Sequence, residues 1–318
     1  MKYTKILGTG SYIPKRILSN TDLERMVDTS DQWITERSGI KRRHIMAADE
    51  SALSLAKEAA KEALAAADIS KSKIDLLIVA TSTPDNLFPN TASRLHGILG
   101  LSTHCPVFDL SAACAGFVYA LSIADNYVKT GNAKHPLIIS SETLSRVVDW
   151  TDRNTCVLFG DGAGAAVLGA ANKPGIYSTI LRADGKYHDL LKMSGNLYNN
   201  SEPRFLHMRG NEVFKVAVKK LGEVVDETLA DNKIKKSDID WLIPHQANLR
   251  IIAATAKKLG ISMERVILTI EEYGNTSSSS VPIALDLGIR SGRIKHDDLL
   301  LLEAFGAGFV WGASLIRY

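Results

Sequence analysis

The segment Ile69-Ser-Lys-Ser-Lys-Ile-Asp75 occurs a second time, 165 residues later, as Ile234-Lys-Lys-Ser-Asp-Ile-Asp240. Two further pairs of segments follow in the same order, at offsets of 160 and 161 residues: Ile98–Ser102 with Lys258–Ser262, and Ile138–Glu142 with Leu299–Glu303. Any one of these short matches is compatible with chance. Three matches in one order at a nearly constant offset indicate a duplicated chain, whose halves we place at residues 1–170 and 171–318.

Each half alternates short apolar segments with longer helical ones. Ile74–Thr81 is an apolar run with the length of a strand that is buried on both faces. Residues 51–67 are expected to form a helix with Ser51 as N-cap, and residues 113–130 a mostly apolar helix. This alternation predicts an α/β fold, layered α-β-α-β-α, with two mostly parallel sheets related by a pseudo-twofold axis. In such sheets catalytic groups are expected at the carboxyl ends of strands.

The composition excludes several classes of protein. The chain has 318 residues, of which 45% are apolar and 23% charged, and its formal net charge of +3 is far from that of a nucleic-acid-binding protein. No apolar run approaches the ~20 residues of a membrane-spanning helix, and the N-terminus lacks the apolar core of a signal peptide. Three cysteines (Cys105, Cys114 and Cys156) are too few for a disulfide framework, which predicts a cytoplasmic protein.

Cys114 lies in Phe108-Asp-Leu-Ser-Ala-Ala-Cys-Ala-Gly-Phe117, directly after a predicted strand and at the start of a predicted helix. The positive end of the helix dipole would favour the thiolate, which is the nucleophilic form. Its small neighbours leave room for a substrate. Position alone, however, favours a buried structural cysteine, because most free cysteines are of that kind. No pair of cysteines has Cys-x-x-Cys spacing, so a thiolate metal site is not expected.

His245 and Asn275 are the candidate polar groups of the second half. His245 ends a predicted strand that repeats Ile74–Thr81, so it is expected at the same edge, where it could donate a hydrogen bond or exchange protons. Asn275 offers an uncharged amide donor at the start of a serine-rich turn. The alternatives are a core histidine and ordinary turn and capping chemistry. The glycine turn in Glu303-Ala-Phe-Gly-Ala-Gly-Phe309 could present backbone N–H groups to an oxyanion.

As a set, these motifs resemble the β-ketoacyl-acyl-carrier-protein synthase III family of the thiolase superfamily. The matching motifs lie in the family's order: Asp31–Ile40 (DQWITERSGI), Ala112–Phe117 (AACAGF), Phe159–Leu168 (FGDGAGAAVL), Pro244–Asn248 (PHQAN), Tyr273–Ser277 (YGNTS) and Glu303–Gly306 (EAFG). The resemblance implies a duplicated thiolase-like fold. The sequence departs from the family at Ser111, Ser278 and Ser279, where alanine is expected, and at Ala307, where many members have glycine.

The resemblance also implies a reaction: decarboxylative Claisen condensation of an acyl-coenzyme A primer with malonyl-acyl-carrier protein, which initiates fatty-acid synthesis. Cys114 would accept the acyl group, and the backbone N–H groups of Cys114 and Ala307 would form the oxyanion hole. His245 and Asn275 would donate hydrogen bonds to the enolate oxygen that forms as carbon dioxide leaves. No metal is expected, and no cofactor apart from the coenzyme A of the substrate.

Ligand and partner surfaces follow from the same resemblance. Trp33, Arg37 and Arg153 would bind coenzyme A, whose adenine and phosphates suit an indole and guanidinium groups. The acidic carrier protein would meet basic residues on two predicted helices, namely Lys215, Arg250, Lys257 and Lys258. The chain would form a homodimer in which Phe88 reaches the partner's acyl pocket. For Trp33 the alternative is an ordinary packed aromatic, and for the basic residues a solvated helix face.

Other functions compete with this one. An acyltransferase or condensing enzyme of secondary metabolism would use the same cysteine with another acceptor. A degradative thiolase would carry a second catalytic cysteine in the C-terminal glycine turn, where Gly306-Ala-Gly308 has none. A non-catalytic binding protein of this fold would lack the cysteine or the histidine, and both are present.

Overall fold

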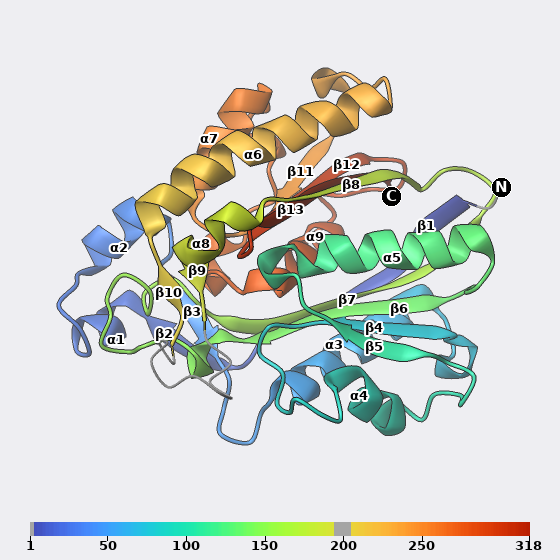
Figure 1. Ribbon diagram of the computed structural model, residues 1–318, viewed down its shortest axis with the longest axis horizontal. Helices are drawn as coiled ribbons and strands as arrows, with labels where there is room; N and C mark the ends of the chain where they lie inside the picture. The colour runs from blue at the N-terminus through green and yellow to red at the C-terminus, as the bar shows by residue number, and fades with distance from the viewer. Residues whose placement is uncertain (1–2, 194–204) are drawn as a thin grey trace.

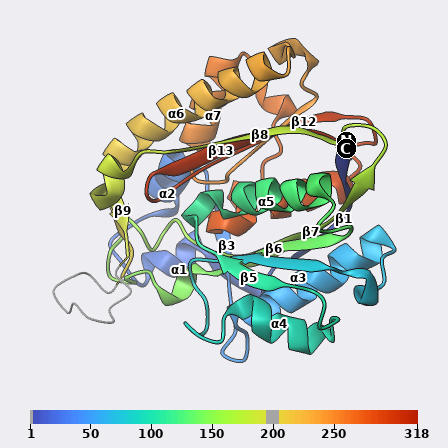
Figure 2. The same ribbon diagram turned by 45° about the vertical axis from the view of Figure 1, so that its right-hand side comes forward.

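The computed structural model describes residues 3–193 and 205–318. Its elements are stacked in layers, which Figures 1 and 2 show as helices, a sheet, helices, a second sheet and helices again. The predicted α-β-α-β-α layering is therefore confirmed. Within the described ranges, none of the helices combines the length and the apolar character needed to cross a membrane.

The first sheet is built from strands between Tyr3 and Ala171. In spatial order these are β1 (Tyr3–Tyr12), β7 (Asp161–Ala171), β6 (Pro136–Thr143), β4 (Leu76–Ala80) and β5 (Val107–Leu110). β4 runs parallel to β5 and β6, whereas β7 is antiparallel to β6 and β1. β4 is the strand predicted at Ile74–Thr81, and all of its side chains are buried because helices cover both faces of the sheet.

The second sheet repeats the first with one strand fewer. In spatial order it contains β8 (Ile176–Ala183), β13 (Val310–Arg317), β12 (Leu299–Gly306) and β11 (Trp241–Pro244). These strands take the places of β1, β7, β6 and β4, with the same parallel and antiparallel pairings. An isolated parallel bridge between Leu242 and Val266 stands where β5 pairs in the first half. The pseudo-twofold relation predicted from the repeats is visible strand by strand.

Both sheets are mixed, which corrects the expectation that they are mostly parallel. In the described chain the parallel pairs are β4 with β5, β4 with β6, and β11 with β12. A helix crosses over between parallel neighbours, whereas only three residues, 307–309, join β12 to β13 and permit nothing but a hairpin. The apolar sequences of β7 and β13 gave no sign of this, because an antiparallel strand covered on both faces is as apolar as a parallel one.

Within the described residues, six helices form the three helical layers. α3 (Ala52–Ala67) and α4 (Thr91–Leu99) cover the first sheet, and α6 (Gly210–Asp231) and α7 (Leu249–Leu259) cover the second. α5 (Gly116–Thr130) and α9 (Ser280–Arg290) lie between the sheets. α3 begins as predicted, since the Ser51 side chain accepts the Ser54 N–H. A fully buried large apolar side chain stabilises the fold by about 1.5–3 kcal/mol, so the shared middle layer binds the two sheets together.

Short elements gather at the end of the molecule that lies on the left in Figure 1. They are α1 (Asn20–Glu24), α2 (Asp31–Ser38), α8 (Ile270–Tyr273), β2 (Arg16–Ser19), β3 (Arg42–Ile45), β9 (Leu191–Lys192) and β10 (His207–Met208). The N-terminal end of α5 and the β12–β13 turn face the same end. Two short 3-10 helices, η2 (Ala113–Ala115) and η7 (Ser277–Ser279), lead into α5 and α9.

Candidate active site

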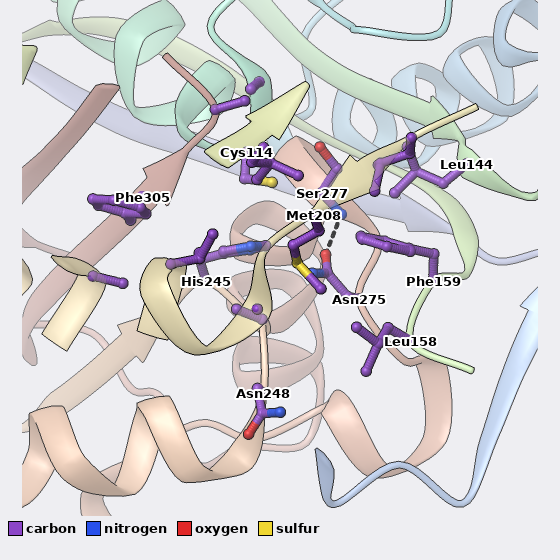
Figure 3. A pocket seen from close by; sticks show the side chains of 18 of the residues that line it. Cys114, Leu144, Leu158, Phe159, Met208, His245, Asn248, Asn275, Ser277 and Phe305 are labelled. Carbon is purple, nitrogen blue, oxygen red and sulfur yellow. Dashed lines mark hydrogen bonds between the residues drawn. The ribbon is translucent and has the colours of Figure 1, made fainter. Parts of the chain in front are cut away.

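A cavity of about 1230 Å³ opens among these short elements. Its walls come from both halves of the chain and include Cys114, His245 and Asn275. Figure 3 shows the three side chains converging on one space from different segments. Three residues chosen from separate sequence motifs thus line a single pocket.

Cys114 sits in η2, between the carboxyl end of β5 and the first turn of α5. The residue before it, Ala113, has a φ of +44°, a left-handed conformation that is uncommon for alanine. Although the thiol can be reached from the pocket, the surrounding protein raises its pKa to about 12 by burial. This outweighs the Ser277 side chain, which lowers the pKa. The expectation that the helix start would favour a thiolate is corrected, because desolvation wins and the resting group is a neutral thiol.

The glycine turn after β12 lies against the backbone of Cys114. A Cβ atom at Gly306 would stand 2.6 Å from the Cys114 backbone nitrogen, which is closer than real contacts allow, and a tight 3.1 Å from the Ala115 nitrogen. Only glycine therefore lets the turn close on η2. Ala307, the next residue, lines the pocket beside Cys114. This close approach brings the turn from the second half onto the loop that carries Cys114 in the first.

His245 follows β11 directly and is buried, with 6% of its surface exposed. Its Nδ1 lies 2.6 Å from the Ser280 hydroxyl oxygen, which also accepts the Gln246 N–H at 3.2 Å. A Ser280 O–H that donates to Nδ1 places the ring proton on Nε2. Burial lowers the pKa of His245 to about 3. The histidine is therefore a neutral hydrogen-bond donor near pH 7.

Asn275 is held by backbone bonds on both sides. Its N–H donates to the Leu158 carbonyl at 2.9 Å, and its carbonyl accepts the Gly160 N–H at 3.0 Å. The side-chain oxygen accepts the Ser277 N–H at 2.8 Å, the bond drawn in Figure 3. Because that N–H can only donate, the amide oxygen must face it. The amide NH₂ group remains available to donate into the pocket.

The three expected coenzyme A residues lie together at the pocket mouth. Trp33 and Arg37 are on α2 and line the pocket. The guanidinium carbons of Arg37 and Arg153 lie 4.9 and 5.0 Å from the centre of the Trp33 ring. Arg153 also donates to the Asp28 carbonyl at 2.7 Å, which fixes its orientation. Two segments about 120 residues apart in the sequence thus present one aromatic, cationic surface.

The basic residues expected at the carrier-protein surface divide into two groups. Lys215 and Arg250 line the pocket, and the Arg250 guanidinium lies 5.8 Å from the Phe214 ring centre. Lys257 and Lys258 lie at the other end of α7 and do not line the pocket. Lys258 donates instead to the Lys219 carbonyl at 3.3 Å.

Phe88 does not line the pocket of its own chain. It is 86% exposed, and its neighbour Leu87 is 65% exposed. Two large apolar side chains in the loop after β4 therefore face solvent in the isolated chain. Such a patch is typical of a surface that contacts another protein.

Several residues at the site were missed by sequence reasoning. Ser277 and Ser280 were interpreted as turn and capping residues, yet they contact the thiol and the imidazole. Glu142 is buried behind the pocket and accepts four hydrogen bonds. The repeat offered one signal, since it pairs Glu142 with Glu303, and each acid follows an apolar stretch within its strand.

Glu303 is expected to make the free energy of unfolding depend on pH. It is buried, and within the described chain neither carboxyl oxygen has a hydrogen-bond partner; burial raises its pKa from 4.5 to about 8. As pH rises from 4.5 to 8, the unfolded chain releases this proton while the folded chain keeps it, so the free energy of unfolding falls by about 1.4 kcal/mol per pH unit. Glu303→Gln has no such dependence.

We therefore expect Glu303→Gln to gain stability relative to the wild type by about 3 kcal/mol between pH 5 and pH 8. Urea unfolding of both proteins at several pH values measures the difference. If the free energies of unfolding of the two proteins change with pH in parallel, Glu303 ionises in the folded state as it does in the unfolded chain, and the expectation is wrong.

The fold and the pocket together indicate a class: thiolase-like proteins in which a cysteine from one half of the chain shares a pocket with a histidine and an asparagine from the other half. Comparison with known proteins narrows the class. The model of the 3-oxoacyl-[acyl-carrier-protein] synthase III family matches residues 108–185. The model of the C-terminal part of the same family matches residues 229–318. A β-ketoacyl-[acyl-carrier-protein] synthase III of Methylococcus capsulatus is 55% identical over 320 residues, covering 100% of this chain and 99% of that protein.

Solved structures agree with the sequence comparison. The 3-oxoacyl-[acyl-carrier-protein] synthase III of Aquifex aeolicus is 48% identical with a TM-score of 0.94, over 99% of this chain and 100% of that one. The priming β-ketosynthase of the R1128 polyketide biosynthetic pathway is 37% identical with a TM-score of 0.95, over 99% and 96%. The chain belongs to the β-ketoacyl-acyl-carrier-protein synthase III family. The family resemblance of its motifs and the predicted thiolase-like fold are confirmed.

Proposed function

We propose that this chain condenses an acyl-coenzyme A primer with malonyl-acyl-carrier protein, with loss of carbon dioxide, and so initiates fatty-acid synthesis. The observation that carries the proposal is the convergence of Cys114, His245 and Asn275 on one pocket. The relative at 55% identity, named a β-ketoacyl-[acyl-carrier-protein] synthase III, supports this function over one in secondary metabolism. The polyketide priming enzyme is more distant, at 37% identity.

Incubation with acetyl-coenzyme A and malonyl-carrier protein tests the reaction. We expect free coenzyme A, carbon dioxide and a 3-ketoacyl-carrier protein in equal amounts, because each turnover forms one carbon–carbon bond. Release of coenzyme A without carbon dioxide would instead define a simple acyltransferase and overturn the proposal.

In the first half-reaction, the Cys114 sulfur attacks the thioester carbonyl of the primer. The negative charge moves to the carbonyl oxygen, where the backbone N–H groups of Cys114 and Ala307 donate hydrogen bonds. The close packing of the Gly306 turn on η2 supports this oxyanion hole, because it brings the residue before Ala307 against the Cys114 backbone nitrogen, and Ala307 lines the same pocket. Removal of one such donor in other enzymes costs about 3–4 kcal/mol of transition-state stabilisation. Coenzyme A leaves, and the acyl group remains on Cys114.

In the second half-reaction, the malonyl group loses carbon dioxide and leaves an enolate. His245 Nε2–H and the Asn275 NH₂ group donate to the enolate oxygen. Both donors are uncharged, and burial keeps the pKa of His245 near 3, so the imidazole stays neutral. The enolate carbon then attacks the acyl group on Cys114. The scheme uses no metal ion and no cofactor other than the coenzyme A of the substrate.

The substrates enter over the aromatic and basic surfaces at the pocket mouth. Trp33 stacks on the adenine of coenzyme A, and Arg37 and Arg153 pair with its phosphates. Arg250 and Lys215 attract the acidic carrier protein, since both line the pocket that its pantetheine arm must enter. Lys257 and Lys258 stand further along α7 and contribute long-range attraction only.

The enzyme works as a homodimer in the cytoplasm. The exposed loop with Leu87 and Phe88 supports a dimer, because a second copy would cover this apolar surface. In the dimer Phe88 reaches the partner's acyl pocket. The three unpaired cysteines support a reducing compartment.

A further inference from the structure

Glu142 is a buried acid beside the nucleophile whose purpose the reaction scheme above leaves open. Its Oε2 accepts the Ser82 N–H at 3.1 Å and the Thr83 hydroxyl at 2.8 Å. Its Oε1 accepts the hydroxyls of Ser277 at 3.1 Å and Ser278 at 2.7 Å. Within the described chain it forms no ion pair with a lysine, arginine or histidine. A buried carboxylate with four donors and no cation is costly to keep charged.

Ser277 connects this carboxylate to Cys114. Its hydroxyl donates to Glu142 Oε1 at 3.1 Å, and its side chain lies near enough to the Cys114 thiol to lower the pKa of that thiol. The two short helices that carry them, η2 and η7, pack against each other. Figure 3 shows the Cys114 sulfur beside Ser277 at the pocket wall. The three groups therefore form a continuous path from the pocket to the buried acid.

The thiol needs such a path. Because burial raises the pKa of Cys114 to about 12, its proton must be removed as the sulfur attacks. His245 is a poor acceptor, because burial lowers its pKa to about 3 and Ser280 occupies its Nδ1. Burial raises the pKa of Glu142, which makes it a stronger proton acceptor than an exposed carboxylate.

We propose that Ser277 and Glu142 form a relay that takes the Cys114 proton during acylation. The proposal rests on the proposed role of Cys114 as nucleophile. As the bond forms between the sulfur and the thioester carbon, the thiol proton moves to Ser277 Oγ and the Ser277 hydroxyl proton moves to Glu142 Oε1. The bond from that carbon to the sulfur of coenzyme A then breaks. Coenzyme A departs as a thiolate and takes a proton from water outside the pocket.

The relay runs backwards in the condensation. When the enolate carbon attacks the acyl group, the bond from the carbonyl carbon to Cys114 breaks and the cysteine leaves as a thiolate. Protonated Glu142 returns its proton through Ser277 to this sulfur. The thiol and the carboxylate are restored, so the chain gains and loses no proton over one cycle.

The described groups that surround Glu142 offer no other titratable side chain with which it could exchange a proton through Ser277. Ser277 and Ser278 face it from η7, and residues 81–83 contribute only hydroxyl and amide groups. On β7 its register partner is Gly162. The nearest acid along that strand, Asp161, accepts from the N–H groups of Met46 and Ser145 and from the Ser145 hydroxyl. Proton transfer to Glu142 thus neutralises a buried charge that has no cationic partner.

The test measures the rate of acylation, as the burst of coenzyme A released from acetyl-coenzyme A in stopped flow between about pH 6 and pH 9. In Glu142→Gln the amide oxygen can still accept the Ser82 N–H, and its NH₂ can donate to the two serine oxygens, so the fold is kept. We expect its acylation rate at pH 7 to fall about a hundredfold and then to rise tenfold per pH unit, whereas the wild-type rate levels off.

Ser277→Ala removes the hydroxyl between Cys114 and Glu142 and leaves the Glu142 carboxylate in place. We expect the same fall in the acylation rate and the same pH profile as for Glu142→Gln. Ser279→Ala is the matched control on the same turn, because its hydroxyl donates to the Gly162 and Thr276 carbonyls rather than to Glu142. Acylation at the wild-type rate and pH profile in either Glu142→Gln or Ser277→Ala, with the melting temperature unchanged, would overturn the relay. If the wild type itself forms no adduct, the role of Cys114 fails instead.

Discussion

Cys114→Ala is expected to form no acyl adduct and to lose condensation by about ten-thousandfold or more. Among the described residues that line the pocket, Cys114 is the only thiol. Intact-mass spectrometry after exposure to a panel of acyl-coenzyme A esters measures the adduct. The wild type should gain one acyl group, and the chain length accepted best defines the primer.

Cys105→Ala is the matched control for this experiment. Cys105 is buried and lies outside the pocket, so its loss should leave both the adduct and turnover in place. An adduct that persists in Cys114→Ala would mean that another side chain carries the acyl group. The assignment of the nucleophile would then be wrong.

His245→Ala is expected to become acylated and yet to stop at decarboxylation, with carbon dioxide release from malonyl-carrier protein reduced by about 10²–10³-fold. The imidazole donates to the enolate oxygen, which exists only in the second half-reaction. Separate assays of adduct formation and of labelled carbon dioxide resolve the two steps. His245→Gln places an amide donor in the same direction and should recover part of the rate.

A His245→Ala protein that is never acylated would contradict this division of labour, because it would make the histidine part of the first step. The pH profile gives a second check. Since burial lowers the pKa of His245 to about 3, decarboxylation should show no histidine titration between about pH 5 and pH 9. A break near pH 6.5 in the wild type that His245→Ala removes would oppose a neutral donor.

Much of the fold could be predicted because the two halves of the sequence still share short matching segments. Segments such as Ile69–Asp75 and Ile234–Asp240 place the strands β4 and β11 in equivalent positions. The mixed character of the sheets was not predictable from the same pattern. The relative direction of two strands depends on the length of the connection between them. β12 and β13 are joined by a hairpin turn between Gly306 and Val310, but the apolar sequences of the two strands do not indicate their direction. The division of the chain at residue 170 stays a prediction.

The candidate site was predictable where strand ends carry distinctive residues. His245 follows β11, and Cys114 follows β5, so topology alone brings them to one edge of the sheets. The effect of burial on the pKa of Cys114 could not be predicted, because a helix start is local whereas burial depends on the whole fold. Glu142 was missed for a related reason. The sequence of an apolar strand that ends with a single acid does not show whether the carboxylate is exposed to water or accepts hydrogen bonds from four buried donors.

The helices α5 and α9 bear on how such a chain could have arisen. Each lies between the two sheets, so a half-length ancestor with one sheet would have left its apolar inner helix in contact with water. Such an ancestor could persist only by pairing with an identical copy, back to back. In the present chain the second half supplies that partner, so each half covers the inner helix of the other.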